Sequence, residues 1–288
     1  PLTLNETYHF QHQEHAYLET EGAFAIPDHG GGVTIYANDQ SPHINRFNTA
    51  AVLGLPAEQV RIIQPPVGGS FGGKDDIGYQ LTAQAAKLAL KTNRPVRLTL
   101  TREESFLISY KRAATSVNLQ IGMDESGKLS AGKAKMVVDS GGYASMSPLA
   151  AWRATMHTLG VYQYAAAQVD TDVVYTNNGY SGAFRGFGSP QAAASSEIAI
   201  DELAVLAKID PIEFRLKNII RKGDKAFTGN EIIYESGLER CLKWVQDASD
   251  WEEKRNQFPQ TDAETLRGVG VACYFHGSGL GGEGLDYA

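Results

Sequence analysis

The first third of the chain contains short hydrophobic runs that are bounded by turn-forming residues. Residues 33–36 and 60–63 are rich in β-branched side chains, which favour strands. Between them, hydrophobic positions in residues 44–53 recur at helical spacing, and Gly54 follows as the type of residue that commonly ends a helix. A second helical pattern covers residues 77–90. This part of the chain is therefore predicted to run strand, helix, strand, helix.

The middle of the chain has the pattern of longer strands. Residues 96–100, 117–121 and 129–138 are predicted strands, and residues 124–127 have the composition of the turn that joins the last two into a hairpin. Residues 169–175 form a further predicted strand. The pattern in this region indicates a meander of hairpins.

Two helices are predicted from an N-cap residue that is followed directly by proline. One helix opens with Ser189 as its N-cap and continues to Ala207, and the next has Asp210 as its N-cap and reaches about Ile220. Hairpins and helices interleave without a regular β-α-β rhythm, so the sequence predicts an α+β fold with mixed sheets, hairpins and packed helices. A change of composition at residues 221–230 predicts a domain boundary there.

Composition narrows the class of protein. The chain has 288 residues, 42% of them hydrophobic and 20% charged, which is typical of a globular protein of one or two domains. A net charge of −7 argues against a nucleic-acid or membrane-surface binder, and no run approaches the roughly 20 apolar residues of a membrane helix. Cys241 and Cys273 are too few for an iron–sulfur cluster within the chain, and a reducing, cytoplasmic setting is expected.

The loop VGGSFGGKDD, residues 67–76, contains the G-x-x-x-x-G-K pattern of phosphate-binding loops between Gly68 and Lys74. The next residue is Asp75, where such loops carry Ser or Thr to hold magnesium, and its carboxylate repels a polyphosphate. Two alternatives remain open from the residues alone. The loop is a tight turn whose glycines supply positive φ angles, or its amides around Phe71 hold an oxyanion or oxo ligand.

Three other patterns have weaker support. Residues 277–282 satisfy G-x-G-x-x-G but lack the following helix and acidic residue of a dinucleotide site. His9, His12 and His15 stand three apart beside Glu14, yet no H-E-x-x-H spacing is present, so a structural role is favoured over metal binding. No G-x-S-x-G elbow supports a serine hydrolase.

The segment SGAFRGFGSPQ, residues 181–191, sets Arg185 between phenylalanines and glycines just before a helix. This arrangement presents a guanidinium and backbone amides to an anionic group, or it is a turn with two packed aromatic rings. The loops at 67–76 and 181–191 together resemble the two signature loops of the xanthine dehydrogenase and aldehyde oxidase family, in its molybdenum-binding catalytic subunit. Residues 13–19 and 210–218 also resemble segments of that family, and the resemblance extends over nearly the whole chain.

The resemblance implies a molybdenum-molybdopterin cofactor, in which the dithiolene of the pterin binds the metal and the protein supplies no direct ligand to it. The cytosine dinucleotide is one form of this cofactor that the resemblance allows. Residues 1–222 would form a first molybdopterin-binding domain, and residues 223–288 the start of a second, cut short. The residues that the resemblance assigns to the cofactor are Gln40, Gly69, Phe71, Gly72, Ala183, Phe184 and Arg185.

The resemblance assigns Asp75, Arg153 and Phe187 to the substrate, and it implies catalytic roles for Gln40 and Arg153. Arg153 matches an arginine that stabilises negative charge on the substrate ring, and Phe187 matches an aromatic residue that stacks on flat substrates. Asp75 is one methylene shorter than the glutamate of purine-oxidising members, which argues against xanthine itself. Gly182 stands where the carbon-monoxide-oxidising branch carries a cysteine, so copper-linked chemistry is not expected.

The implied reaction is oxidative hydroxylation of an N-heterocycle or an aldehyde, with water as the oxygen source. In the family the general base is a glutamate near the end of the full subunit, and no such loop follows here, so we expect a fragment that is inactive alone. Iron–sulfur and FAD groups are expected on partner modules, in an oligomer. Two alternatives are a nucleotide-triphosphate binder that uses the loop from Gly68 to Lys74, and a non-catalytic assembly or interaction module.

Overall fold

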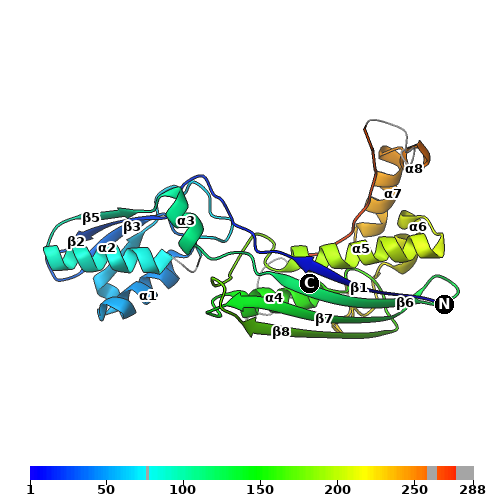
Figure 1. Cartoon of the computed structure of the whole chain (residues 1–288), viewed down its shortest axis with the longest axis horizontal. Helices are drawn as coiled ribbons and strands as arrows, with labels where there is room; N and C mark the ends of the chain where they lie inside the picture. Colours follow the sequence, from blue (N-terminus) through cyan, green and yellow to red (C-terminus); the bar gives the residue numbers. More distant parts are fainter. Residues whose placement is uncertain (76–77, 258–264, 277–288) are drawn as a thin grey trace.

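The computed structural model describes residues 1–75, 78–257 and 265–276. The described chain folds into two lobes, each built on a four-stranded sheet (Figure 1). The smaller lobe contains α1, α2 and α3 with one sheet, and the larger lobe contains the other sheet with α4 to α8. The α+β fold with mixed sheets that the sequence predicts is confirmed.

The smaller lobe has a mixed sheet in which β3 and β4 run parallel and the other neighbours run antiparallel. Its strands, in sheet order, are β4 (Val60–Ile63), β3 (Val33–Ala37), β2 (Gly22–Pro27) and β5 (Val96–Thr99). Its helices are α1 (Pro42–Leu53), the 3-10 turn η1 (Ala57–Gln59), α2 (Gly78–Thr92) and α3 (Arg102–Ile108). The core of this lobe forms where α2 packs on β2 and β3.

The larger lobe has a longer sheet, in which β7 and β8 run parallel and the other pairs run antiparallel. Its strands, in sheet order, are β1 (Leu2–Phe10), β6 (Thr115–Met123), β7 (Leu129–Gly141) and β8 (Ala166–Tyr175). Buried and more exposed residues alternate along β6, because one face of the sheet is covered by helices. These helices are α4 (Ser147–His157) and α5 (Ser189–Ala207), followed by α6 (Pro211–Asn218), α7 (Leu238–Ala248) and α8 (Trp251–Gln257).

The ends of three helices can be compared with the caps that the sequence predicts. Gly54 ends α1 in the left-handed conformation, with φ of 69°, and the Asp210 side chain accepts from the first amides of α6, as predicted. The predicted N-cap of α5 was wrong by one residue, since Gly188 and not Ser189 holds that position. A Cβ on Gly188 would lie 2.1 Å from the carbonyl oxygen of Ala150, so only glycine fits where α5 crosses α4.

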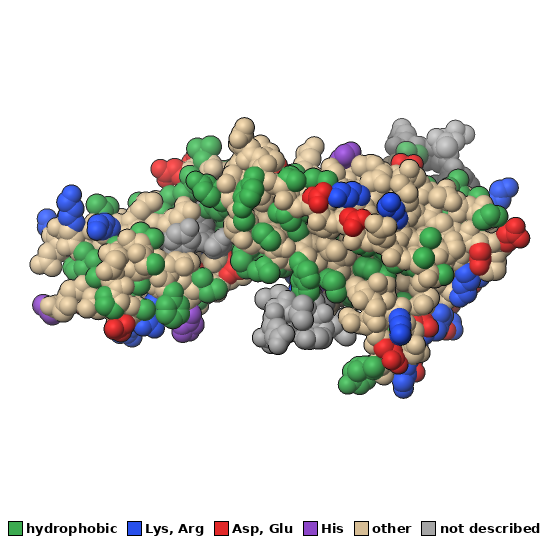
Figure 2. Space-filling view, turned by 90° about the horizontal axis from the view of Figure 1, so that it is seen from below, with side chains coloured by type: hydrophobic (Ala, Val, Ile, Leu, Met, Phe, Trp, Pro, Cys, Tyr) green, Lys and Arg blue, Asp and Glu red, His purple; other side chains and the backbone are tan. Residues whose placement is uncertain are grey.

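Residues beyond the predicted boundary at 222–223 pack onto the larger lobe. Leu242, Trp251 and Cys273 are buried in the same hydrophobic core that β6, β7 and α5 share. The face seen in Figure 2 shows Lys and Arg side chains beside Asp and Glu on both lobes, with hydrophobic side chains between them. In the described part of the chain, none of the helices combines the length and the apolar character that crossing a bilayer requires.

Candidate active site

The glycine-rich loop that follows β4 touches the loop that precedes α5. The Arg185 N–H donates to the carbonyl of Phe71 at 2.8 Å. Gly72 has a φ of +98°, and a Cβ there would lie 2.8 Å from the carbonyl oxygen of Ala183 and 3.1 Å from the Cα of Phe184. Only glycine permits this approach, so the two loops meet backbone to backbone.

Gln40 holds the first loop in place. The side-chain Oε1 of Gln40 accepts from the Gly72 N–H at 3.0 Å and from the Ser70 hydroxyl. The backbone N–H of Gln40 donates to the Lys74 carbonyl at 3.0 Å. Because Oε1 is used in this way, Nε2 is the end of the carboxamide that can donate to a bound group.

Asp75 and Tyr110 continue this network toward the larger lobe. The Asp75 carboxylate accepts from the Ser41 hydroxyl, and the Asp75 N–H donates to the Tyr110 hydroxyl oxygen at 3.1 Å. The Tyr110 hydroxyl in turn donates to the Gly72 carbonyl. The carboxylate of Asp75 is therefore fixed beside the loop contact.

Arg112 and His15 support the second loop. The Arg112 guanidinium carbon lies 4.1 Å from the centroid of the Phe184 ring, and Nη2 donates to the Arg185 carbonyl at 2.8 Å. The His15 ring stacks on Phe184 with a centroid distance of 4.2 Å, and its Nε2 donates to the Ala183 carbonyl at 2.7 Å. Burial lowers the pKa of His15, which favours the neutral ring in this contact.

A pocket of about 510 Å³ opens at the junction of the two lobes. Nine of the ten residues singled out from the sequence line it, and Gly69 is the exception. At Gly69 an added Cβ would lie 3.1 Å from the Cβ of Tyr17, under the loop instead of in the pocket. The lining residues are Gln40, Phe71, Gly72, Asp75, Met146, Arg153, Ala183, Phe184, Arg185, Gly186, Phe187 and His276.

Arg153 reaches the pocket from α4, a helix that the sequence did not predict. It is 5% exposed, its guanidinium carbon lies 5.9 Å from the Phe187 ring centroid, and its Nη1 lies 2.9 Å from Nε2 of His276. Phe187 and Phe71 both have positive φ, 48° and 56°, which is uncommon for bulky residues and costs free energy. Two aromatic residues at the pocket therefore hold strained backbone conformations.

Lys74, the lysine of the G-x-x-x-x-G-K pattern, does not line the junction pocket. It is 1% exposed, its Nζ donates to Oε2 of Glu19 at 3.3 Å, and the same Nζ lies 4.5 Å from the Tyr17 ring centroid. Burial lowers the pKa of Lys74. A lysine held in this way does not reach the phosphates of a nucleotide, so this geometry argues against the nucleotide-triphosphate reading. The glycine pattern at 277–282 lies outside the described residues.

The three N-terminal histidines contact separate partners. His9 pairs with the Ser116 hydroxyl at 2.9 Å, His12 lies 3.4 Å from the Asp139 carboxylate, and His15 supports the second loop. Across residues 1–75, 78–257 and 265–276, no group of three or more His, Cys, Asp or Glu side chains is arranged to hold a metal ion. These contacts are of the kind that structural histidines make, and the role predicted for the three residues stays a prediction.

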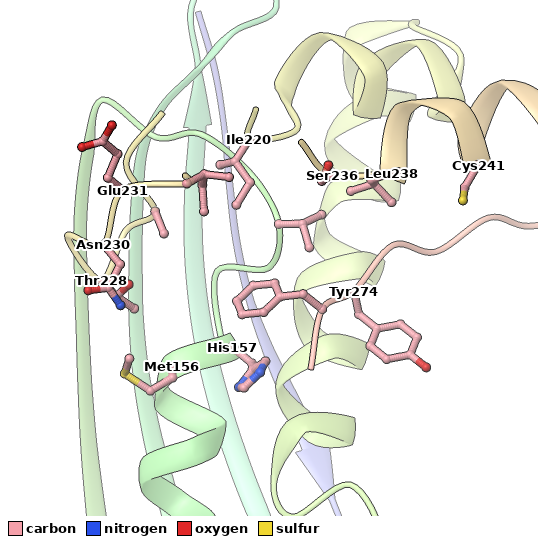
Figure 3. Close-up of a pocket in the computed structure, with 15 residues that line it drawn as sticks. Met156, His157, Ile220, Thr228, Asn230, Glu231, Ser236, Leu238, Cys241 and Tyr274 are labelled. Carbon is pink, nitrogen blue, oxygen red and sulfur yellow. The ribbon is translucent and has the colours of Figure 1, made fainter. Parts of the chain in front are cut away.

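A second cavity, of about 440 Å³, lies in the larger lobe away from both glycine loops (Figure 3). Its walls are mainly apolar, and none of the residues predicted for the site lines it. Figure 3 shows residues from the end of α4, from the loop before α7 and from α7 itself around it: Met156, His157, Thr228, Asn230, Glu231 and Cys241. We assign the candidate site to the junction pocket, because Arg153, Arg185 and Asp75 line it, whereas the walls of the second cavity are mainly apolar.

Residues 1–219 match the family described as molybdopterin cofactor-binding domain. The chain belongs to this family. The family resemblance predicted from the two loops is thereby confirmed, and the match ends near the predicted boundary, which itself stays a prediction.

Relatives of this molybdopterin-binding chain are longer proteins. It is 37% identical over 285 residues to a probable xanthine dehydrogenase subunit of Bacillus subtilis (strain 168), covering 99% of this chain and 37% of that protein. It is 37% identical over 246 residues to the nicotinate dehydrogenase large molybdopterin subunit of Eubacterium barkeri, covering 85% of this chain and 57% of that relative. The solved aldehyde oxidoreductase of Desulfovibrio gigas superposes with a TM-score of 0.81 at 26% identity, covering 89% of this chain and 28% of that one.

The junction pocket suits the group that the family binds. A molybdopterin is a flat, polar, anionic molecule. The pocket offers the Nε2 end of Gln40, the exposed guanidinium of Arg185 and a stretch of backbone at Gly72 from which any side chain is excluded. Gln40 and Arg185 supply hydrogen-bond donors, and the Gly72 backbone lets a bound group come close to the chain. This set suits a cofactor in which the pterin, and not a side chain of the protein, binds the metal.

Proposed function

We propose that this chain is part of the catalytic subunit of a molybdenum hydroxylase, which converts an N-heterocycle or an aldehyde to its hydroxylated product with oxygen from water. The observation that carries the proposal is the convergence of nine predicted residues, from both lobes, on one pocket. Relatives named xanthine dehydrogenase, nicotinate dehydrogenase and aldehyde oxidoreductase support this reaction class.

We propose that the two loops bind the molybdenum-molybdopterin cofactor, which supplies two-electron oxidation at its metal when bound. Gln40 would donate from Nε2 to the oxo side of that group. The backbone at Phe71, Gly72, Ala183 and Phe184 and the guanidinium of Arg185 would hold the pterin. Gly69 would act indirectly: its positive φ of 98° gives the loop the turn that precedes Phe71.

On the substrate side, we propose that Phe187 stacks on a flat ring and that Arg153 stabilises negative charge that develops on it. Asp75 would face the substrate with a carboxylate held by Ser41. Because this carboxylate is short and already fixed, a smaller heterocycle or an aldehyde is favoured over xanthine. The reaction balances as R–H plus water to R–OH, two protons and two electrons.

The remaining assignments follow from the same reading. We propose that residues 1–222 form a first molybdopterin-binding domain and that residues 223–288 belong to a second. The glutamate base is proposed to come from the part of the relatives' length that this chain does not span. The electrons would leave through iron–sulfur and FAD groups on partner modules of an oligomeric enzyme, and the pterin is proposed to be the cytosine dinucleotide form. A cytoplasmic setting is proposed, consistent with the free thiols of Cys241 and Cys273.

The test is hydroxylation by the complete enzyme in ¹⁸O-labelled water, with nicotinate, xanthine and an aromatic aldehyde as substrates. We expect the label in the product, with xanthine the poorest of the three. Arg153→Met is expected to lower kcat, and Lys74→Ala is the matched variant of a cation outside the pocket. A loaded enzyme that turns over none of the three, or that takes oxygen from O₂, contradicts the proposal. A magnesium-ATP shift in Tm that Lys74→Ala abolishes would instead favour the nucleotide reading.

A further inference from the structure

We propose that His276 is a positioning residue for Arg153: it accepts a hydrogen bond from the guanidinium and holds it in the orientation that the pocket needs. The proposal rests on the proposed function, because it assigns Arg153 to the substrate. His276 belongs to no motif that the sequence revealed, and it lies 123 positions from Arg153 along the chain.

The direction of each hydrogen bond follows from the chemistry of the partners. A guanidinium has donors only, so the contact of 2.9 Å between Arg153 Nη1 and His276 Nε2 requires Nε2 to accept. The proton of the neutral ring then sits on Nδ1, which lies 3.2 Å from the Ser189 hydroxyl oxygen and donates to it. One neutral tautomer satisfies both contacts, and a protonated ring would lose the bond to Arg153.

Arg153 is also held at its backbone. Its carbonyl accepts from Nδ1 of His157 at 2.6 Å, one turn further along α4. The His157 ring packs on the Phe275 ring with a centroid distance of 4.7 Å, and it lies 5.9 Å from the His276 ring. The segment that carries His276 therefore contacts α4 at two levels, which fixes the imidazole relative to the arginine.

The same segment is tied to the interior of the larger lobe. The Cys273 N–H donates to Oε2 of Glu197 at 2.7 Å, and Glu197 also pairs with the fully buried Arg215 at 2.9 Å and accepts from the Tyr162 hydroxyl at 2.6 Å. This carboxylate thus anchors the chain three residues before His276. A rigid anchor is what a positioning residue requires.

Residues 274–276 contribute to the lining of both cavities. Tyr274, labelled in Figure 3, and Phe275 line the apolar cavity, whereas His276 lines the junction pocket. Tyr274 is therefore a suitable control, since it belongs to the same segment and faces the other side.

Loss of the acceptor removes one of the contacts that orient the Arg153 guanidinium toward the substrate. A charge that is to stabilise a transition state must be placed before the reaction, and a misplacement of about 1 Å can lower the rate by roughly 100-fold. We expect His276→Phe to lower kcat by about 10-fold to 100-fold with KM changed by less than about threefold. His276→Gln carries an amide oxygen that can accept from Arg153, and it is expected to recover most of kcat. Tyr274→Phe is expected to match the wild type.

The second readout does not depend on turnover. In the complete enzyme, phenylglyoxal modification of Arg153, measured by peptide mass spectrometry relative to Arg185, reports how tightly the guanidinium is held. We expect this ratio to rise several-fold in His276→Phe and to stay near the wild-type value in His276→Gln and Tyr274→Phe.

Wild-type kcat and an unchanged labelling ratio in His276→Phe would overturn the inference, and so would a His276→Gln variant no better than His276→Phe. If the wild-type enzyme hydroxylates none of the substrates while the labelling ratio still depends on His276, the proposed function fails and the positioning contact stands.

Discussion

Replacing Gly72 by alanine tests the contact on which the site depends. The new Cβ would lie 2.8 Å from the carbonyl oxygen of Ala183 and 2.9 Å from its carbonyl carbon, and real Cβ contacts essentially never fall under 3.0 Å. The neighbour is backbone, not the end of a flexible side chain, so the loops must separate.

The cost has two parts. A side chain at a φ of +98° adds about 1–2 kcal/mol of backbone strain, and overpacking against a fixed neighbour adds about 1–3 kcal/mol. We therefore expect Gly72→Ala to destabilise the junction by about 2–5 kcal/mol. Gly69→Ala is the matched control, since Gly69 has the same φ of +98° but its Cβ would meet the side chains of Tyr17 and Phe71, at 3.1 and 3.3 Å, instead of the second loop.

The assay compares the two variants in the complete subunit, by denaturant unfolding and by the pterin retained after gel filtration. Gly72→Ala is expected to lose about 1–3 kcal/mol more than Gly69→Ala, which is the overpacking part alone, and to lose most of its pterin. Equal unfolding midpoints and equal pterin content in the two variants would refute the backbone-contact reasoning.

Three further changes have expected outcomes. Burial lowers the pKa of His15 in the folded protein, so the unfolded chain binds the proton more readily and the free energy of unfolding falls as the pH drops below about 6.5. Denaturant unfolding between about pH 5 and 8 should show a smaller fall of this free energy in His15→Gln than in the wild type. Parallel curves for the two proteins would contradict this. Asp75→Glu restores the longer carboxylate and should raise kcat/KM for xanthine relative to nicotinate by about 10-fold, whereas an unchanged ratio argues that Asp75 does not face the substrate. Glu197→Gln removes one of the two carboxylates that pair with the buried Arg215, and Asp201 at 2.6 Å stays as the other. We expect it to lower the free energy of unfolding by about 1.5–3 kcal/mol, and a loss below about 1 kcal/mol would contradict this.

Local signals predicted several elements correctly. β4 has the predicted bounds, and the caps at Gly54 and Asp210 end and begin their helices as expected. These features depend on a few neighbouring residues, so the sequence carries them directly. β2 was not predicted, because its small alternating residues form a strand only between the partners β3 and β5.

The sequence did not predict those features of the site that depend on contacts between distant segments of the chain. α4 follows a glycine- and serine-rich passage, and its alanines give a weak periodic signal, although this helix carries Arg153. Lys74 has the place of a phosphate-binding lysine in its motif, but Glu19 holds it in the interior. Gly69 and Gly72 have the same φ, and only the fold tells which one touches the second loop. His276 contacts the site through its hydrogen bond with Arg153, 123 positions away in the sequence, and no local sequence pattern predicts such a contact.

The central claim is that the junction of the two loops holds a molybdenum-pterin group. The direct measurement is the molybdenum and pterin content of the complete, natively produced subunit, beside its Gly72→Ala and Gly69→Ala variants. We expect metal and pterin in equal amounts, close to one of each per chain. Both should be lost together in Gly72→Ala, with a smaller loss in Gly69→Ala, which strains the loop but does not touch the second loop. A fully active subunit without molybdenum, or one whose pterin is indifferent to Gly72, would contradict it.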